Sequence, residues 1–193
     1  MTQYSIFTHG TALQVERPET VREILRVGGG TAVTLHLPIL DTTVAPDAHD
    51  DEGPGTWMHL PLTSTLTTFG RSNPKLVSVT LLYECRHCRI ADVHVWDGGA
   101  LVYQFNGKHL RGSSLAQRNS SDINPGSAAL PASAFSNTLA LPSRHEVFSA
   151  IGVSFFVRWF RTDLHGDEYD LKHGRFPDSV VLIAAVGAQY VVD

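Results

Sequence analysis

Apolar and polar side chains alternate with a period of two residues through the central part of this sequence. From 75 to 84 the apolar positions that share one face are Val77, Val79, Leu81 and Tyr83. Residues 89–96 alternate in the same way, with Ala91, Val93 and Val95 opposite Asp92, His94 and Trp96. Successive side chains of a strand point to opposite faces, so the pattern predicts two half-buried antiparallel strands.

Other segments of the chain also have the pattern of strands. Asp97-Gly98-Gly99 predicts a tight turn that leads into a return strand at 101–105. Further strand candidates are 12–16, 32–39, 57–63, 152–160 and 179–192. Residues 18–25 fit a short helix and, almost equally well, a short strand. About eight strands predict an all-β fold, namely an antiparallel β-sandwich, jelly-roll-like and with long loops, formed as one domain by residues 1–193.

Composition and charge argue against several classes of partner. The 193 residues are 42% hydrophobic, which is close to the globular average, and only 18% charged, so we do not expect a disordered chain. The chain has 15 basic and 19 acidic residues, and the resulting net charge of −4 gives no general attraction to nucleic acid or to anionic membranes. No run approaches the roughly 20 apolar residues of a membrane-spanning helix.

The first residues bear on where the protein is found in the cell. They lack a basic region followed by an apolar run, so we expect no signal peptide. The default expectation is therefore a cytoplasmic protein, and export without a conventional signal stays open.

Two of the predicted strands are apolar on both faces. Residues 180–186 are apolar at every position, and residues 153–160 are rich in apolar side chains on both faces. Such a strand lies in the centre of a sheet, is covered on both sides, or lies at a subunit interface. Two of them exceed what one sandwich core requires, so we expect the chain to form homo-oligomers.

Two segments carry residue types that ligate metals. Cys85 and Cys88 could supply two thiolates for zinc, but a structural zinc site takes four ligands and the chain has 2 cysteines. The alternative is that both cysteines lie in a hairpin turn between the two predicted strands. A second segment contains oxygen ligands suited to calcium, without the spacing of an EF-hand: Asp47, Asp50, Asp51 and Glu52. A solvated acidic loop has the same composition, so the sequence does not require a cofactor. Calcium and zinc are the two ions that these segments could bind.

A tryptophan and a histidine stand two residues apart on each of two predicted strands. Alternation places Trp57 and His59 on the outer face of one strand, and Asp92, His94 and Trp96 on the outer face of the other. Indole rings stack on sugar rings and other flat ligands, while His and Asp supply hydrogen bonds. The pattern predicts a binding face, for a carbohydrate among other ligands. Alternatively, this face packs under residues 112–146 or against a partner subunit.

Three stretches carry a resemblance to a family. They are FTHG at 7–10 followed by QVE at 14–16, GTWMHLP at 55–61, and VHVWDG at 93–98. Together they resemble an uncharacterised family of small bacterial β-rich proteins with no assigned activity. The resemblance implies a compact β-rich domain, supplies no catalytic residue, and draws attention to His9, Trp57, His59, His94 and Asp97. The acidic loop and the Cys-Arg-His-Cys segment depart from the family pattern.

Three functional hypotheses remain. The first is a non-catalytic binding or self-assembly module that forms homo-oligomers through its C-terminal strands. The second is a lectin-like domain that binds carbohydrate or calcium with the Trp/His face. The third is a metal-dependent enzyme, although the sequence contains no nucleophile elbow, phosphate loop, dinucleotide fingerprint or His-Glu-x-x-His motif. A catalytic triad assembled from distant residues would leave no such motif.

Overall fold

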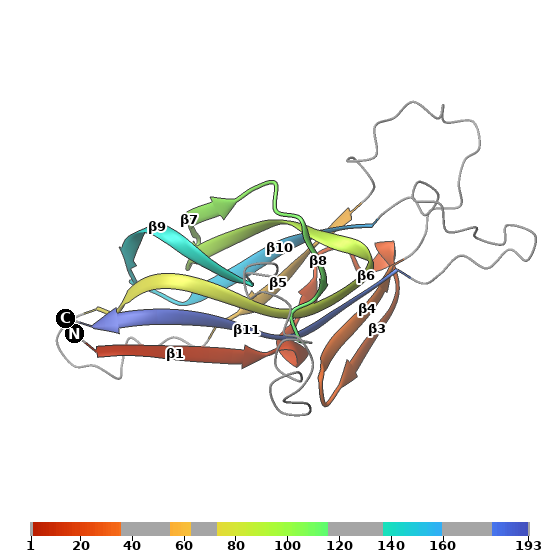
Figure 1. The fold of residues 1–193 in the computed structure, drawn as a ribbon, viewed down its shortest axis with the longest axis horizontal. Coiled ribbons are helices and arrows are strands. Elements are labelled where there is room, and N and C mark those ends of the chain that lie inside the picture. Colours follow the sequence, from red (N-terminus) through yellow and green to blue (C-terminus); the bar gives the residue numbers. More distant parts are fainter. Residues whose placement is uncertain (1, 36–54, 63–72, 116–136, 160–178, 193) are drawn as a thin grey trace, which may run out of the picture.

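The fold is built almost entirely of antiparallel strands. A computed structural model describes residues 2–35, 55–62, 73–115, 137–159 and 179–192 (Figure 1). The strands in these ranges are β1 (Thr2–His9), β2 (Gln14–Val15), β3 (Val21–Val27), β4 (Gly30–Leu35), β5 (Gly55–Pro61), β6 (Lys75–Asp97), β7 (Ala100–Phe105), β8 (Leu110–Ser113), β9 (Thr138–Glu146), β10 (Ile151–Trp159) and β11 (Val180–Val192). Two short 3₁₀ turns, η1 (Gly10–Ala12) and η2 (Pro18–Thr20), are the helical elements of the described residues. The predicted all-β class is confirmed.

Strand β6 is the central strand of the sheet. It is 23 residues long, and it pairs first with β11 and then, from Cys88 onward, with β10. Strands β9, β8 and β7 also pair with it, as the central yellow and green ribbon in Figure 1 shows. The prediction of a hairpin turn at Cys85 and Cys88 is therefore wrong, because β6 continues through both residues.

The reason for that error is a change in the phase of alternation along β6. The bulky buried side chains change from Leu81 and Tyr83 to Ile90, and then back to Val93 and Val95. Irregular register accompanies these changes, for example where β10 pairs with residues 90 and 92 and leaves residue 91 without a partner in the ladder. A β-bulge adds one residue to one strand and shifts its alternation. One bulged strand thus has the sequence pattern of two strands joined by a turn.

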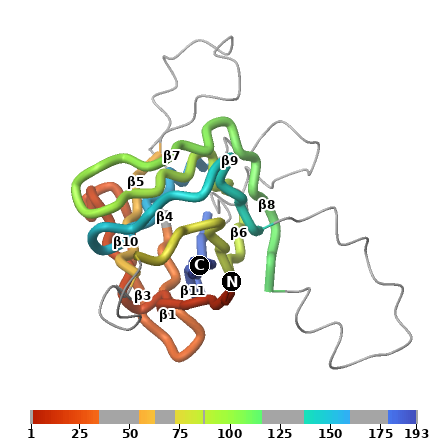
Figure 2. The backbone as a smooth tube through the Cα atoms, turned by 90° about the vertical axis from the view of Figure 1, so that its left-hand side faces the viewer, coloured from red at the N-terminus to blue at the C-terminus, as the bar shows by residue number. Residues whose placement is uncertain are grey.

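The rest of the sheet extends from both partners of β6. Beyond β10 lie β5 and β2, and beyond β11 lie β4 and β3, with β1 paired to the C-terminal part of β11. Since β1 pairs with β11 while β2 pairs with β5, the chain crosses between these two parts of the sheet within η1. Figure 2 shows the backbone curving around a common interior. All eleven strands belong to one hydrogen-bonded sheet, so the two separate sheets of a sandwich or jelly roll are not confirmed.

One hydrophobic cluster fills this interior. Its largest fully buried side chains come from both parts of the sheet and include Met58, Leu60, Leu81, Tyr83, Phe155, Ile183 and Tyr190. The predicted burial of alternate residues on 57–63 and 89–96 is confirmed by Met58, Leu60, Val93 and Val95. Strand β11 is central, with neighbours on both edges, which is one of the three positions its apolar sequence allowed.

The structure bears on the predicted helix and on the predicted loops only in part. Residues 18–25 form η2 and most of β3, so the helical part is only one 3₁₀ turn. The long loops that the sequence predicts at 41–56, 112–146 and 162–178 lie in large part outside the described residues. The prediction is wrong at the end of the second loop, because residues 138–146 form strand β9, which pairs with β6. Within the part of the chain that the structure describes, no helix has the length and apolar character needed to cross a membrane.

Candidate functional site

Strands β5, β10 and β6 bring the predicted Trp/His pairs onto one outer face. Ser154 of β10 is the register partner of both His59 on β5 and His94 on β6. Likewise, Phe156 lies between Trp57 and Asp92 in the register. Residues directly opposite in a sheet point to the same side, and the intervening residues of all three strands are buried in the core. The paired Trp, His, Phe and Asp side chains are half-buried and lie on the opposite side of the sheet.

The aromatic rings on this face touch one another. The centroids of Trp57 and His94 are 4.5 Å apart, and those of Trp57 and Phe156 are 5.2 Å apart. His94 continues the cluster to Trp96, at 6.3 Å between centroids. We call these four side chains the aromatic face. Tilted ring pairs at such distances are mutually attractive, so the aromatic face is held in place by its own contacts.

Polar groups accompany the rings. The Nδ1 atom of His59 lies 2.8 Å from the hydroxyl of Ser154. The guanidinium of Arg158 lies over the ring of Phe156, 5.1 Å from its centroid. The positive charge is attracted to the face of the aromatic ring. The carboxylate of Asp92 accepts a 3.0 Å hydrogen bond from the backbone N–H of Gly107. Asp92 therefore braces the segment after β7, in addition to sharing this face.

Next to the rings, Gly152 leaves a position without a side chain. In the register it lies between Pro61 of β5 and Trp96 of β6. A Cβ atom placed on Gly152 would meet only the Cβ of Trp96 among the described residues, at 3.8 Å. A ligand group can thus approach the backbone of β10 beside the indole of Trp96.

The structure brings all five predicted ligand-binding residues onto this face and adds three from β10. Trp57, His59, Asp92, His94 and Trp96 were predicted from their spacing. Gly152, Ser154 and Phe156 were missed as site residues. Their alternate spacing is present in the sequence, but the segment predicts a strand that is apolar on both faces, without a sign of which strands flank it. Strand β10 lies between β5 and β6 because it pairs with both. These pairings join segments far apart in the sequence, and no local pattern encodes them.

The structure places the two cysteines predicted as zinc ligands next to each other in the core. Both are buried and free, and the thiol of Cys88 donates to the carbonyl of Val180 at 3.3 Å. A hydrogen bond with the Cys88 side chain, together with burial, raises the pKa of the Cys85 thiol. No three His, Cys, Asp or Glu side chains within the described ranges are grouped so that they could hold a metal. The residues predicted to hold calcium, Asp47, Asp50, Asp51 and Glu52, lie outside the described residues.

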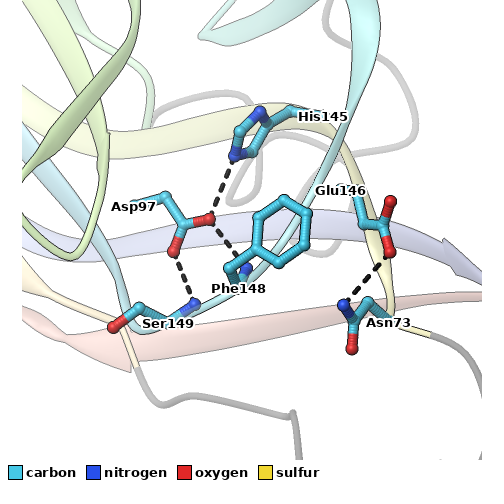
Figure 3. A network of polar contacts seen from close by, with 6 residues as sticks. All are labelled: Asn73, Asp97, His145, Glu146, Phe148 and Ser149. Carbon is cyan, nitrogen blue, oxygen red and sulfur yellow. Dashed lines mark hydrogen bonds and ion pairs between the residues drawn. The ribbon is translucent and has the colours of Figure 1, made fainter.

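A second polar network surrounds Asp97 at the end of β6 (Figure 3). Its carboxylate accepts hydrogen bonds from the backbone N–H groups of Phe148, at 2.8 Å, and Ser149, at 2.7 Å. The same carboxylate lies 3.0 Å from Nε2 of His145. Asp97 is only 7% exposed and thus ties the β9–β10 connection to the end of β6. The arrangement satisfies backbone donors, which is a structural role.

His9, to which the family resemblance also points, joins two parts of the backbone. Its Nδ1 accepts from the backbone N–H of Thr11 at 3.3 Å, and its Nε2 lies 3.1 Å from the carbonyl oxygen of Gly28. It therefore fastens the end of β1 to the turn between β3 and β4.

Comparison with known proteins gives no assignment. No protein-family model matches the chain, and a search of curated proteins gives no match either. The resemblance to the family of small bacterial β-rich proteins stays a prediction.

Proposed function

We propose that this protein is a non-catalytic binding module that holds a carbohydrate on the outer face of β5, β10 and β6. The observation that carries the proposal is the contact between Trp57 and His94, which joins two Trp/His pairs from separate strands into one surface. Large rings that are half-buried on the outside of a sheet offer flat apolar area to a ligand at little entropic cost.

The chemistry of the face favours a neutral ligand with rings and hydroxyl groups. The apolar side of a sugar ring packs on indole, and its hydroxyls bond to imidazole groups such as those of the half-buried His59 and His94. Asp92 accepts a backbone hydrogen bond, and Arg158 lies over the ring of Phe156, so both charged groups already have partners within the protein. The proposal does not depend on calcium.

The test combines a glycan microarray with isothermal titration of the sugars that bind. We expect binding that Trp57→Ala and Trp96→Ala each reduce by about fivefold to 150-fold, because each removes stacking area worth on the order of 1–3 kcal/mol. The matched control is Phe148→Ala, which removes an aromatic ring that is 67% exposed and belongs to the β9–β10 connection. Far-UV circular dichroism must show that all variants keep the fold. Binding that survives both Trp substitutions would disprove this site.

Self-association is a second candidate function, supported by a different surface. Three of the exposed large apolar side chains lie on β1 and β3: Phe7 at 52%, Leu25 at 50% and Val27 at 42% exposure. Large apolar side chains that are exposed on a protein surface can take part in contacts with a partner. Native mass spectrometry of the full chain tests this candidate. A discrete oligomer that Phe7→Glu dissociates, and that Ala140→Glu on β9 leaves intact, would support it, whereas a monomer at all concentrations would exclude it.

A further inference from the structure

We propose that Cys85 and Cys88 bind one copper(I) ion between their two sulfur atoms. The site is independent of the proposed carbohydrate face, because both cysteines are buried in the core of the protein.

An irregular part of β6 brings the two cysteines to the same side of the strand. Residues three apart in a regular strand point to opposite faces. Cys85 and Cys88 nevertheless belong to one buried cluster, at 6% and 1% exposure. Between them β6 leaves β11 and takes β10 as its partner, and its ladder with β8 shifts register. Such an irregularity changes the phase of alternation, so both side chains face the core.

The contacts with β11 place both cysteines at the same point. Cys85 is the register partner of Val181, and the thiol of Cys88 donates to the carbonyl oxygen of Val180 at 3.3 Å. The two cysteine side chains are also hydrogen bonded to each other. Two sulfur atoms in contact can hold the same ion after small rotations of their side chains.

The number and type of these ligands favour copper(I). Thiolates are soft ligands, which select copper(I) and zinc over calcium and magnesium. Zinc takes four protein ligands, or three and a water. Among the residues that the structure describes, no third His, Cys, Asp or Glu side chain joins the pair, and water has little access to Cys88 at 1% exposure. Copper(I) is satisfied by two thiolates in a line, so this pair is a complete site for it.

Binding exchanges one cation for two protons. Each thiol gives its proton to the solvent as its sulfur binds the ion, and copper keeps its +1 state, so no electron is transferred. The site therefore changes from neutral to one negative charge. Arg89 follows Cys88 directly in β6 and is itself buried, at 5% exposure. A positive charge nearby lowers the cost of burying the complex.

The experiment is anaerobic titration of the reduced full chain with copper(I), in competition with the coloured chelator bathocuproine disulfonate. We expect one copper ion per chain. Native mass spectrometry should show the mass of that ion less two protons. Cys85→Ser and Cys88→Ser should each weaken binding by more than about 100-fold, because loss of an outer-shell partner alone costs roughly 10- to 100-fold.

Two matched controls test whether other ligands take part. His87→Ala removes the imidazole that stands between the two cysteines in the sequence, and a two-thiolate site does not need it. Met58→Leu removes a buried thioether of the same core cluster. Both variants should bind copper(I) as tightly as the wild type.

A second measurement does not depend on the serine variants keeping their fold. Copper(I) held by the folded site should raise the thermal midpoint of the wild type by several degrees, because a ligand of the native state stabilises it. A midpoint that copper leaves unchanged or lowers would overturn the proposal, since the unfolded chain would then bind the ion at least as well.

Two further results would also overturn the proposal. Unchanged copper binding in both folded serine variants would place the ion elsewhere. One zinc ion per chain that displaces copper(I), and that His87→Ala releases, would show a zinc site with additional ligands. Neither result would bear on carbohydrate binding.

Discussion

Trp57 and His94 belong to strands that are not neighbours, yet their ring centroids are only 4.5 Å apart. Strand β10 runs between them and places Ser154, with its small side chain, in the register next to His94. Trp57 also contacts Phe156 of β10, so its indole extends over the middle strand toward β6. This contact is what turns two separate sequence motifs into one surface.

Removing His94 should loosen Trp57. We expect His94→Ala to increase acrylamide quenching of tryptophan fluorescence and to destabilise the fold by about 0.5–1.5 kcal/mol, the usual worth of one ring pair. Of the three tryptophans, Trp159 is buried in the core and contributes a constant background. Phe148→Ala should leave the quenching unchanged. Equal quenching in wild type and His94→Ala would show that the ring contact does not restrain Trp57.

Asp97 should be among the most sensitive polar positions. Asp97→Ala removes the acceptor of two backbone N–H groups and the partner of His145. Hydrogen bonds to a charged group contribute about 1.5–3 kcal/mol each, and solvent can replace part of them, so we expect a loss of roughly 3 kcal/mol in urea unfolding. The nearby control is Asn73→Ala, which removes the exposed 3.1 Å bond to Glu146 and should cost less than about 1 kcal/mol. Similar losses in both variants would contradict a special role for Asp97.

Tyr83 should make the protein unstable in alkali. Burial, with a smaller contribution from Cys85, raises the pKa of Tyr83 from 10.0 to about 12. The folded state then holds this proton more tightly than the unfolded state, so the stability that Tyr83 contributes is intact below pH 10 and falls as the pH rises from 10 to 12. The Cys85 thiol, whose pKa is also raised, adds a separate loss of stability in alkali. Urea unfolding at a series of pH values measures this fall, and Tyr83→Phe should make it shallower. Burial also raises the pKa of Tyr190, so some alkaline sensitivity should remain in the variant. An unchanged slope in Tyr83→Phe would mean that Tyr83 is not responsible.

Two glycines should respond differently to the same substitution. A Cβ atom on Gly10 would overlap the backbone carbonyl of Ile183, whereas the nearest atoms to one on Gly187 belong to the ring of Phe7. The exposed Phe7 ring can turn away, but the Ile183 backbone is fixed in the sheet. We expect Gly10→Ala to lower the free energy of unfolding by several kcal/mol, with a clear drop in the thermal midpoint, and Gly187→Ala to have a small effect on both. Equal effects would show that η1 can move away from β11.

Much of the fold class was readable in the sequence. The alternation around Leu81 and Val93 predicted strands because a strand exposes successive residues to opposite environments, and that environment leaves a local record. The same reasoning failed at Cys85 and Cys88, where a change of phase was interpreted as a turn. A bulge and a turn both interrupt alternation, and only the hydrogen-bonded register of β6 distinguishes them.

By itself, the sequence determined that Trp57/His59 and His94/Trp96 each share one face of a strand, because side chains two residues apart point the same way wherever no bulge intervenes. Only the tertiary structure decided that β10 lies between these pairs and contributes Gly152, Ser154 and Phe156 to the same face. Strand order is set by backbone pairing between segments far apart in the chain, and every strand offers the same N–H and C=O groups to its neighbours.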